Sequence, residues 1–154
     1  TPLMLQLLFV YFALPMVGIK LPDIAAALLA FTLNYTAYFA EIFRAGIQAV
    51  PKGQYEAAHM LGLSKVQTMW RVVIPQMIRN VLPPMSNETI NLVKDTSLIY
   101  ILAMNDLLRV ARTIVQREFD MTPFVVAAVF YLAMTAVLTW GFKKLEAHYG
   151  KYAR

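Results

Sequence analysis

Charged and hydroxyl side chains stand together at one point of this chain, between apolar stretches. Lys94 and Asp95 are followed directly by Thr96 and Ser97. A carboxylate accepts hydrogen bonds from an ammonium or guanidinium group, an ammonium pairs with a carboxylate, and a hydroxyl both donates and accepts. The cluster follows a segment that contains Pro83-Pro84, and we expect an irregular, proline-broken helix there. We therefore predict a ligand pocket, against the alternative of a Lys–Asp pair followed by a helix cap.

A second polar group lies inside the uncharged segment 24–40. Asn34 and Tyr38 are four residues apart, so a helix would place them on one face, beside Tyr35. Polar side chains at membrane depth are costly and usually functional, although they also join helices by hydrogen bonds. Both interpretations stay open for this group. Asn91, on the segment before Lys94, is a further candidate ligand contact.

The elements that carry these residues are apolar enough for a membrane. The chain has 154 residues and is 59% hydrophobic, whereas soluble domains are about 45–50% apolar. Four segments are candidates for crossing or entering a bilayer, and segment 72–93 is the weakest because it contains charges and two prolines. We predict an all-α integral membrane protein. The four segments are 3–19, 24–40 with a continuation to about 47, 72–93 and 121–142.

The basic residues suggest an orientation. Segment 44–71 and the C-terminal tail are rich in Lys and Arg, so both are predicted to be cytoplasmic. Segment 94–120 is then at the outer side, where residues 105–117 have the spacing of an amphipathic helix capped by Asn105 or Asp106. The tail residues behind this prediction are Lys143, Lys144, Lys151 and Arg154.

Several functions find no support in the residues. The chain has no cysteine and its two histidines, His59 and His148, are far apart, so we predict no metal site. The net charge of +5 comes from basic residues beside apolar segments, which favours membrane topology over nucleic-acid binding. We find neither a catalytic cluster nor a phosphate-binding loop. No catalytic residue is therefore predicted.

The polar stretch of about 51–71 is the most specific feature. Pro51 and Gly53 break the preceding helix, and a short helix over 54–63 ends near Gly62. Ser64 and Gln67 have the spacing of a capping box for the next helix. Small residues beside an acid, on a helix facing water, suit docking of another protein, although an incidental loop is the alternative. The predicted docking residues are Glu56, Ala57, Ala58, Leu61 and Gly62.

This stretch resembles a known motif. Glu56-Ala57-Ala58, three residues, Gly62, nine residues, then Val72-x-Ile74-Pro75 is similar to the EAA motif of ATP-binding-cassette (ABC) importer permeases, with Val for Ile and Ile for Leu. Segments 34–47 and 94–98 resemble the polar amino acid branch of that family. Thr1-Pro2-Leu3 is similar to the continuation of an RGTPL run, so we expect the first one or two helices to be missing.

The resemblance implies a type I ABC importer transmembrane domain over residues 1–154. It would have about three to four membrane helices and a cytoplasmic coupling helix in the loop of about 51–71. The implied function is a permease that imports polar amino acids, with glutamate/aspartate or glutamine preferred, across the cytoplasmic (inner) membrane of a bacterium. The implied substrate residues are Asn34, Tyr35, Tyr38, Asn91, Lys94, Asp95, Thr96 and Ser97.

The resemblance also implies partners. An ATPase dimer would bind ATP and Mg and hydrolyse ATP, so this chain would be neither an enzyme nor a cofactor binder. A second permease subunit, identical or paralogous, and an extracytoplasmic substrate-binding protein would complete the complex within the membrane lipid. Two alternatives remain from the residues alone. A secondary amino acid transporter would not explain residues 56–75, and a membrane enzyme would lack a catalytic cluster.

Overall fold

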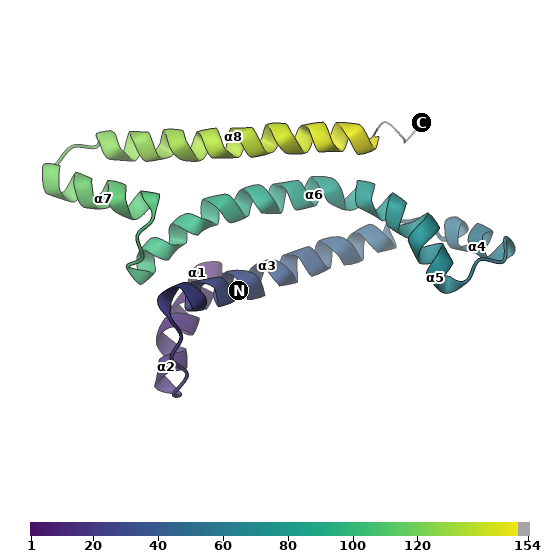
Figure 1. Ribbon diagram of the computed structural model, residues 1–154, viewed down its shortest axis with the longest axis horizontal. Coiled ribbons are helices and arrows are strands. Elements are labelled where there is room, and N and C mark those ends of the chain that lie inside the picture. The colour runs from purple at the N-terminus through teal and green to yellow at the C-terminus, as the bar shows by residue number, and fades with distance from the viewer. Residues whose placement is uncertain (151–154) are drawn as a thin grey trace. The chain divides into compact units, whose positions relative to one another are not determined.

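The computed structural model describes residues 1–150, and all regular elements there are helical (Figure 1). The predicted all-α fold is therefore confirmed. The predicted cytoplasmic residues Lys151 and Arg154 lie outside the described residues. In order, the elements are α1 (Leu3–Leu8), η1 (Phe9–Ala13), α2 (Leu14–Met16), α3 (Asp23–Gln48), α4 (Lys52–Met60), α5 (Lys65–Thr68), η2 (Met69–Val73), α6 (Ile74–Asp95), η3 (Thr96–Leu102), α7 (Leu107–Glu118) and α8 (Thr122–Gly150).

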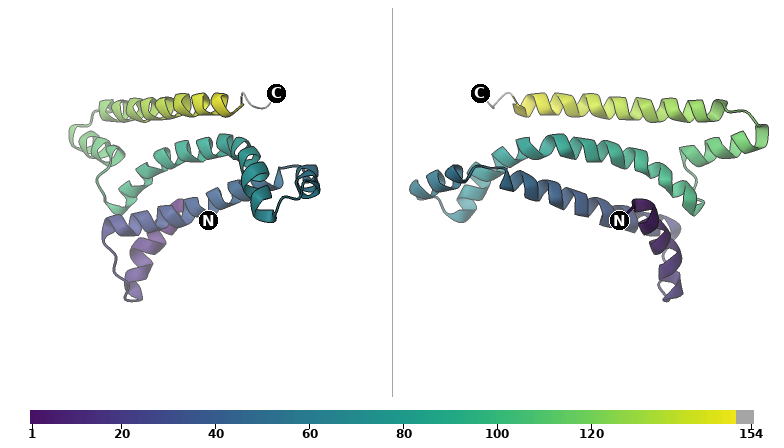
Figure 2. Two further views of the ribbon diagram at one scale, coloured as in Figure 1. Left: turned by 45° about the vertical axis from the view of Figure 1, so that its right-hand side comes forward. Right: turned by 180° about the vertical axis from the view of Figure 1, so that it is seen from behind.

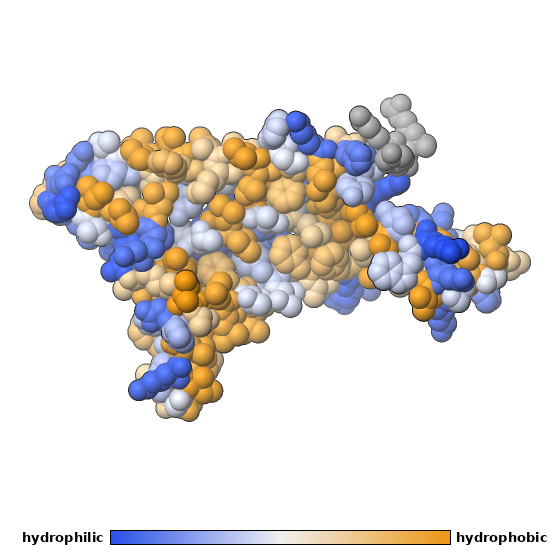
Figure 3. Space-filling view, in the orientation of Figure 1, coloured by the Kyte–Doolittle hydropathy of each residue, from blue (hydrophilic) through white to orange (hydrophobic). Residues whose placement is uncertain are grey.

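Two of the described helices are long and apolar enough to cross a membrane, namely α3 and α8. They agree with the predicted segments 24–47 and 121–142. Figure 3 shows hydrophobic side chains gathered over α8, and only 6% of its most apolar window is buried. An exposed apolar surface of this length fits contact with lipid. The predicted segment 3–19 forms α1, η1 and α2, and is shorter than the roughly 20 residues of a spanning helix.

The helix α6 passes through Pro83 and Pro84 without interruption. Proline lacks an N–H, so the carbonyls of Arg79 and Asn80 lose their helical donors. The hydroxyls of Ser86 and Thr89 donate to backbone carbonyls four residues earlier, each at 2.8 Å. The prediction that the prolines break this segment is therefore wrong, because α6 continues to Asp95.

The chain divides into two compact units. The first consists of Thr1–Ala37 with Ile90–Leu138. Three alanines of α3 are buried in it, and small side chains of this kind let neighbouring elements approach closely. The buried apolar residues of this unit include Leu3, Leu7, Val10, Ala26, Ala27, Ala30 and Leu102.

The second unit consists of Tyr38–Thr89 with the chain from Thr139 onward. Here α4 and α5 fold back on each other, as both views of Figure 2 show. A continuous helical run leads from α5 through the π-helical turn η2 into α6, and Pro75 is the second residue of α6. The buried apolar side chains include Val50, Ala58, Val73 and Val81.

The segment after α6 has a defined structure in the first unit. The 3-10 helix η3 begins directly after Asp95 and ends at Leu102, with Ala103 as its C-cap. Asp106 then caps α7, because its carboxylate accepts from the backbone N–H groups of Leu108 and Arg109 at 3.1 and 2.9 Å. The predicted amphipathic helix over 105–117 is confirmed, with Asp106 as its cap.

Candidate functional site

Two predicted site residues that are distant in sequence meet in the first unit. The Tyr35 hydroxyl of α3 donates a hydrogen bond to Asp95 Oδ2 at the end of α6, at 2.8 Å across 60 residues of sequence. Tyr35 is only 5% exposed, and its ring lies nearly parallel to that of Phe31, with centroids 6.3 Å apart. Burial and ring packing fix the hydroxyl, which in turn orients the carboxylate.

The neighbouring hydroxyls hold the end of α6. Thr96 Oγ1 donates to the carbonyl of Val93, and Ser97 Oγ donates to the carbonyl of Lys94, each at 2.7 Å. These protons are used on the last turn of α6, which leaves the hydroxyl lone pairs free to accept. Thr96 and Ser97 therefore cap the preceding helix, not a following one.

Lys94 lies exposed in the last turn of α6, where a cation complements the helix dipole. Glu41–Arg44 and Arg117–Glu118 form ion pairs, and neither pair includes Lys94 or Asp95. Within residues 1–150, Lys94 and Asp95 therefore do not form the ion pair that was the alternative to a ligand pocket. The Lys94 ammonium and the Asp95 carboxylate present opposite charges side by side in sequence at one helix end.

One residue near this cluster is absent from the sequence prediction. Tyr131 of α8 places its hydroxyl beside the hydroxyls of Ser97 and Thr96. Segment 121–142 has the pattern of an uncharged membrane span, and that pattern alone gives its polar atoms no role. A tyrosine in the middle of such a segment was the available signal.

Other predicted site residues have different surroundings. Asn34 is buried, with 6% exposed, whereas Tyr38 is 51% exposed and belongs to the second unit. Asn34 and Tyr38 therefore differ in burial although they are four residues apart on α3. Asn91 is exposed on α6.

The second unit presents the polar hairpin formed by α4 and α5. Gly62 has φ +74° and ends α4 in a Schellman motif, with Gly62 N–H donating to the His59 carbonyl and Leu63 N–H to the Ala58 carbonyl. The predicted capping box is present, because Ser64 and Gln67 bond reciprocally at 2.9 and 3.3 Å. The preceding helix α3 ends at Gln48, before Pro51 and Gly53, and Gly53 lies inside the next helix, α4.

The hairpin exposes most of the predicted docking residues. Glu56, Ala57, Gly62 and Leu61, the last of these 79% exposed, lie at the surface. Ala58 is only 2% exposed, so its small side chain lies beneath the hairpin surface. Met60, which is not among the predicted docking residues, is 86% exposed and adjoins Leu61 in sequence. A cavity of about 360 Å³ opens beside it, lined by Tyr55, His59, Leu63, Lys65, Thr68 and Met69.

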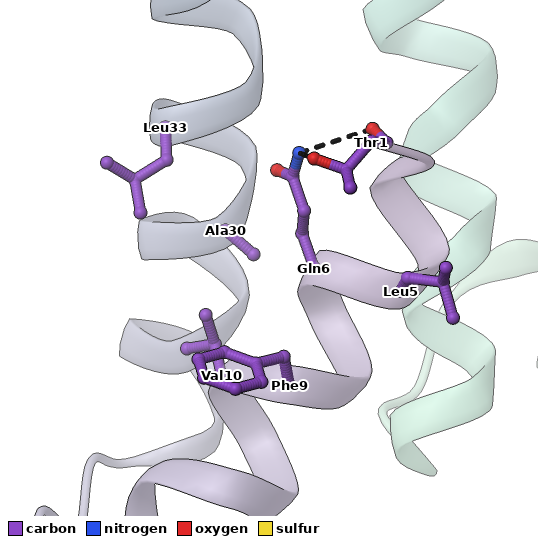
Figure 4. Close-up of a pocket in the computed structure, with 7 residues that line it drawn as sticks. All are labelled: Thr1, Leu5, Gln6, Phe9, Val10, Ala30 and Leu33. Carbon is purple, nitrogen blue, oxygen red and sulfur yellow. Dashed lines mark hydrogen bonds between the residues drawn. The ribbon is translucent and has the colours of Figure 1, made fainter.

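A second, mainly apolar cavity of about 600 Å³ lies in the first unit between α1 and α3 (Figure 4). The Gln6 amide nitrogen donates to the Thr1 carbonyl and hydroxyl at 3.3 and 3.1 Å. Gln6 Oε1 is a buried acceptor without a partner within residues 1–150. An N–H or O–H donor placed in this cavity would satisfy it. No predicted site residue lines this cavity.

Comparisons with known proteins agree with these features. Residues 1–151 match the family described as "Binding-protein-dependent transport system inner membrane component". The probable amino-acid ABC transporter permease protein YckA of Bacillus subtilis is 41% identical over 98% of this chain and 67% of its own length. The L-cystine transport system permease protein TcyB of the same organism is 36% identical over 99% of this chain and 66% of its own length.

A crystal structure of an amino acid ABC transporter with histidines has a TM-score of 0.88 to this chain. The two chains are 38% identical, and the match covers 96% of this chain and 70% of the chain in the crystal structure. The chain thus spans about two thirds of the length of its curated relatives. This match sets aside the secondary transporter and the membrane enzyme, and it assigns ATP hydrolysis to a partner subunit. The chain belongs to the binding-protein-dependent inner membrane components, as a permease of an amino acid ABC importer.

Proposed function

We propose that this permease carries polar amino acids, glutamine, glutamate or aspartate first among them, and binds them at the end of α6. The hydrogen bond between Tyr35 and Asp95 is the observation that carries this proposal. It holds a carboxylate in a fixed orientation at a helix end, next to the Lys94 ammonium. Asp95 would accept from the substrate's α-ammonium group, and Lys94 would meet its α-carboxylate.

The relatives support recognition of the amino acid backbone. Proteins similar to this chain are named as glutamine, L-cystine and arginine transport permeases. Those substrates have very different side chains but share the α-ammonium and α-carboxylate groups. A site that binds both charged groups would accept all of them, so finer selectivity would rest on the separate binding protein. The full proposed contact set remains Asn34, Tyr35, Tyr38, Asn91, Lys94, Asp95, Thr96 and Ser97.

We also propose that the α4–α5 hairpin docks on the ATPase. Glu56, Ala57, Leu61 and Gly62 would form the contact, with Ala58 packing beneath it. The loop of about 51–71, within a single permease domain over residues 1–154, would carry the coupling helix. Residues 44–71 and the C-terminal tail would face the bacterial cytoplasm, and ATP and Mg would bind in the ATPase dimer. A second permease copy or paralogue and a binding protein outside would complete the importer.

The substrate proposal is tested by uptake in proteoliposomes that contain the complete complex. Twenty labelled amino acids are first screened, and KM is then measured for the best one. Asp95→Asn is expected to raise KM about tenfold, because a hydrogen bond to a charged group contributes roughly 1.5–3 kcal/mol. Tyr35→Phe removes only the orienting hydroxyl and should raise KM less.

Glu118→Gln is the matched control, since it removes an exposed carboxylate on α7. Its KM should equal that of the wild type. An unchanged KM in Asp95→Asn, in a complex with normal ATPase activity, would remove Asp95 from the site. Preferential uptake of an apolar amino acid in the screen would contradict the proposed substrate class.

A further inference from the structure

The C-terminal end of α3 packs against α6 at a glycine. A Cβ atom on Gly46 would lie 2.1 Å from Val81 Cγ1 and 3.2 Å from Met77 Cγ. Real Cβ atoms essentially never approach another atom as closely as the first of these distances. Gly46 is buried and Val81 is 3% exposed, so the contact is internal to the second unit. Only glycine permits this separation of the two helices.

The hairpin is attached to the same part of α6. Gln76 of α6 donates from Nε2 to Gln54 Oε1 of α4 at 3.3 Å and to the Val72 carbonyl at 3.0 Å. Val50, between α3 and α4, is 4% exposed. Gln76 and Met77 are adjacent in sequence, and Val81 lies about one turn further along α6. Successive turns of α6 therefore hold first the hairpin and then the end of α3.

We propose that Gly46 is a positioning residue for energy coupling. The close contact between α3 and α6 makes the end of α3, the hairpin and the start of α6 move as one body. A displacement of the hairpin then moves α6 directly, without sliding of one helix along the other. This inference rests on the proposed docking of the hairpin on the ATPase, but Gly46 itself touches neither ATPase nor substrate in that arrangement.

A cycle of three variants tests the contact. Gly46→Ala inserts a methyl group where Val81 Cγ1 lies, and Val81→Ala removes that atom and loosens the contact. Each single variant should lower the number of substrate molecules transported per ATP hydrolysed. We expect a decrease of about tenfold for Gly46→Ala, which overpacks the contact, and of about threefold for Val81→Ala, which loosens it. The double variant adds one methyl group to α3 where Val81→Ala has removed two from α6. The clash is then absent and part of the lost contact is refilled, so the ratio should return toward the wild-type value.

Gly141→Ala in α8, outside the hairpin, is the matched control, because an added Cβ there meets nothing within 4 Å. Its ratio of transport to ATP hydrolysis should equal that of the wild type. All variants are purified with the ATPase in the complete complex, so that loss of docking is measured separately. Failure of the wild-type permease to co-purify with an ATPase would contradict the proposed docking, whatever the variants do.

The inference is overturned if both single variants keep the wild-type ratio in complexes that contain the ATPase. It is also overturned if the folded double variant remains as uncoupled as Gly46→Ala. Should Gly46→Ala fail to insert, Val81→Ala decides, since removing methyl groups from one side chain leaves the backbone of both helices unobstructed. If Val81→Ala keeps the wild-type ratio of transport to ATP hydrolysis, the role of Gly46 is rejected. If Val81→Ala lowers that ratio and the double variant restores it, the role is supported.

Discussion

Two polar segments of the chain end their helices in the same left-handed backbone conformation but with different residues. In the α4–α5 hairpin the position is Gly62, with φ +74°. In the segment from η3 to α7 the positions are Ala103 and Phe119, with φ 59° and 52°. Glycine adopts this conformation freely, whereas a residue with a Cβ pays roughly 1–2 kcal/mol.

The difference shows which segment is optimised locally. At the turn of the hairpin, the end of α4 and the start of α5 both have the residues that their backbone favours, Gly62 and the Ser64–Gln67 capping box. The segment η3–α7 keeps two strained positions, and it directly follows the candidate substrate residue Asp95. Strain of this kind persists where surrounding structure imposes it, and it often marks functional regions. The hairpin is thus built to hold one shape, as transmission of force would require.

Among the predicted changes, replacement of Gly62 is expected to have the largest effect, on coupled uptake and on ATPase binding. A β-branched residue at positive φ is a severe outlier, so Gly62→Val should disrupt the Schellman motif that joins α4 to α5. We expect loss of nearly all coupled uptake and of ATPase co-purification, with the permease still inserted in the membrane. Uptake and pull-down from the same membranes measure both.

Gly62→Asn is the control for that variant, because asparagine tolerates the left-handed conformation better than other residues with a Cβ. An added Cβ at position 62 meets no atom within 4 Å, so the backbone conformation alone separates the two variants. Equal activity of Gly62→Val and Gly62→Asn would show that the left-handed turn is not what docking requires.

Phe119→Gly is expected to act in the opposite direction and more weakly. Phe119 is 92% exposed, so its removal costs little packing within the chain. Relief of the left-handed strain, less the entropy of an added glycine, should stabilise the protein by about 0.5–1 kcal/mol. A higher thermal unfolding midpoint in detergent would be the result, and a lower one would mean that the ring contacts lipid or a partner. Val110→Ala, at a half-exposed position of α7 with ordinary helical geometry, should not give this stabilisation.

The same contrast explains what could be predicted from sequence. Gly62, Ser64 and Gln67 act through hydrogen bonds to residues at most five positions away, so their spacing revealed the hairpin. The spans α3 and α8 were predictable because runs of uncharged residues reflect the solvent around a helix, whatever its partners.

The candidate site was only partly predictable because it depends on distant contacts. Tyr35 and Asp95 were both named, but no local rule indicates that residues 60 positions apart form a hydrogen bond. Tyr131 and Gly46 were missed for the same reason, since their importance arises from Ser97 and Val81 on other helices. The prolines of α6 misled the prediction, because α6 is packed at Val81 and Ser86 on either side of them, and packing overrides a local helix breaker.

The smallest predicted effect concerns Asp120, which lies two residues before the first residue of α8. Its Oδ1 accepts from the Thr122 N–H and hydroxyl at 3.0 and 2.8 Å, and these hydrogen bonds lower the pKa of the carboxyl group below its ordinary value. A carboxyl group with a lowered pKa in the folded state stabilises that state above its unfolded pKa, near 3.9. This contribution disappears as the pH falls through the folded-state pKa. The midpoint of thermal unfolding should therefore differ between wild type and Asp120→Asn at neutral pH, and the difference should shrink below about pH 4. A difference that stays constant down to about pH 2.5 would show that the charge of Asp120 does not stabilise the start of α8.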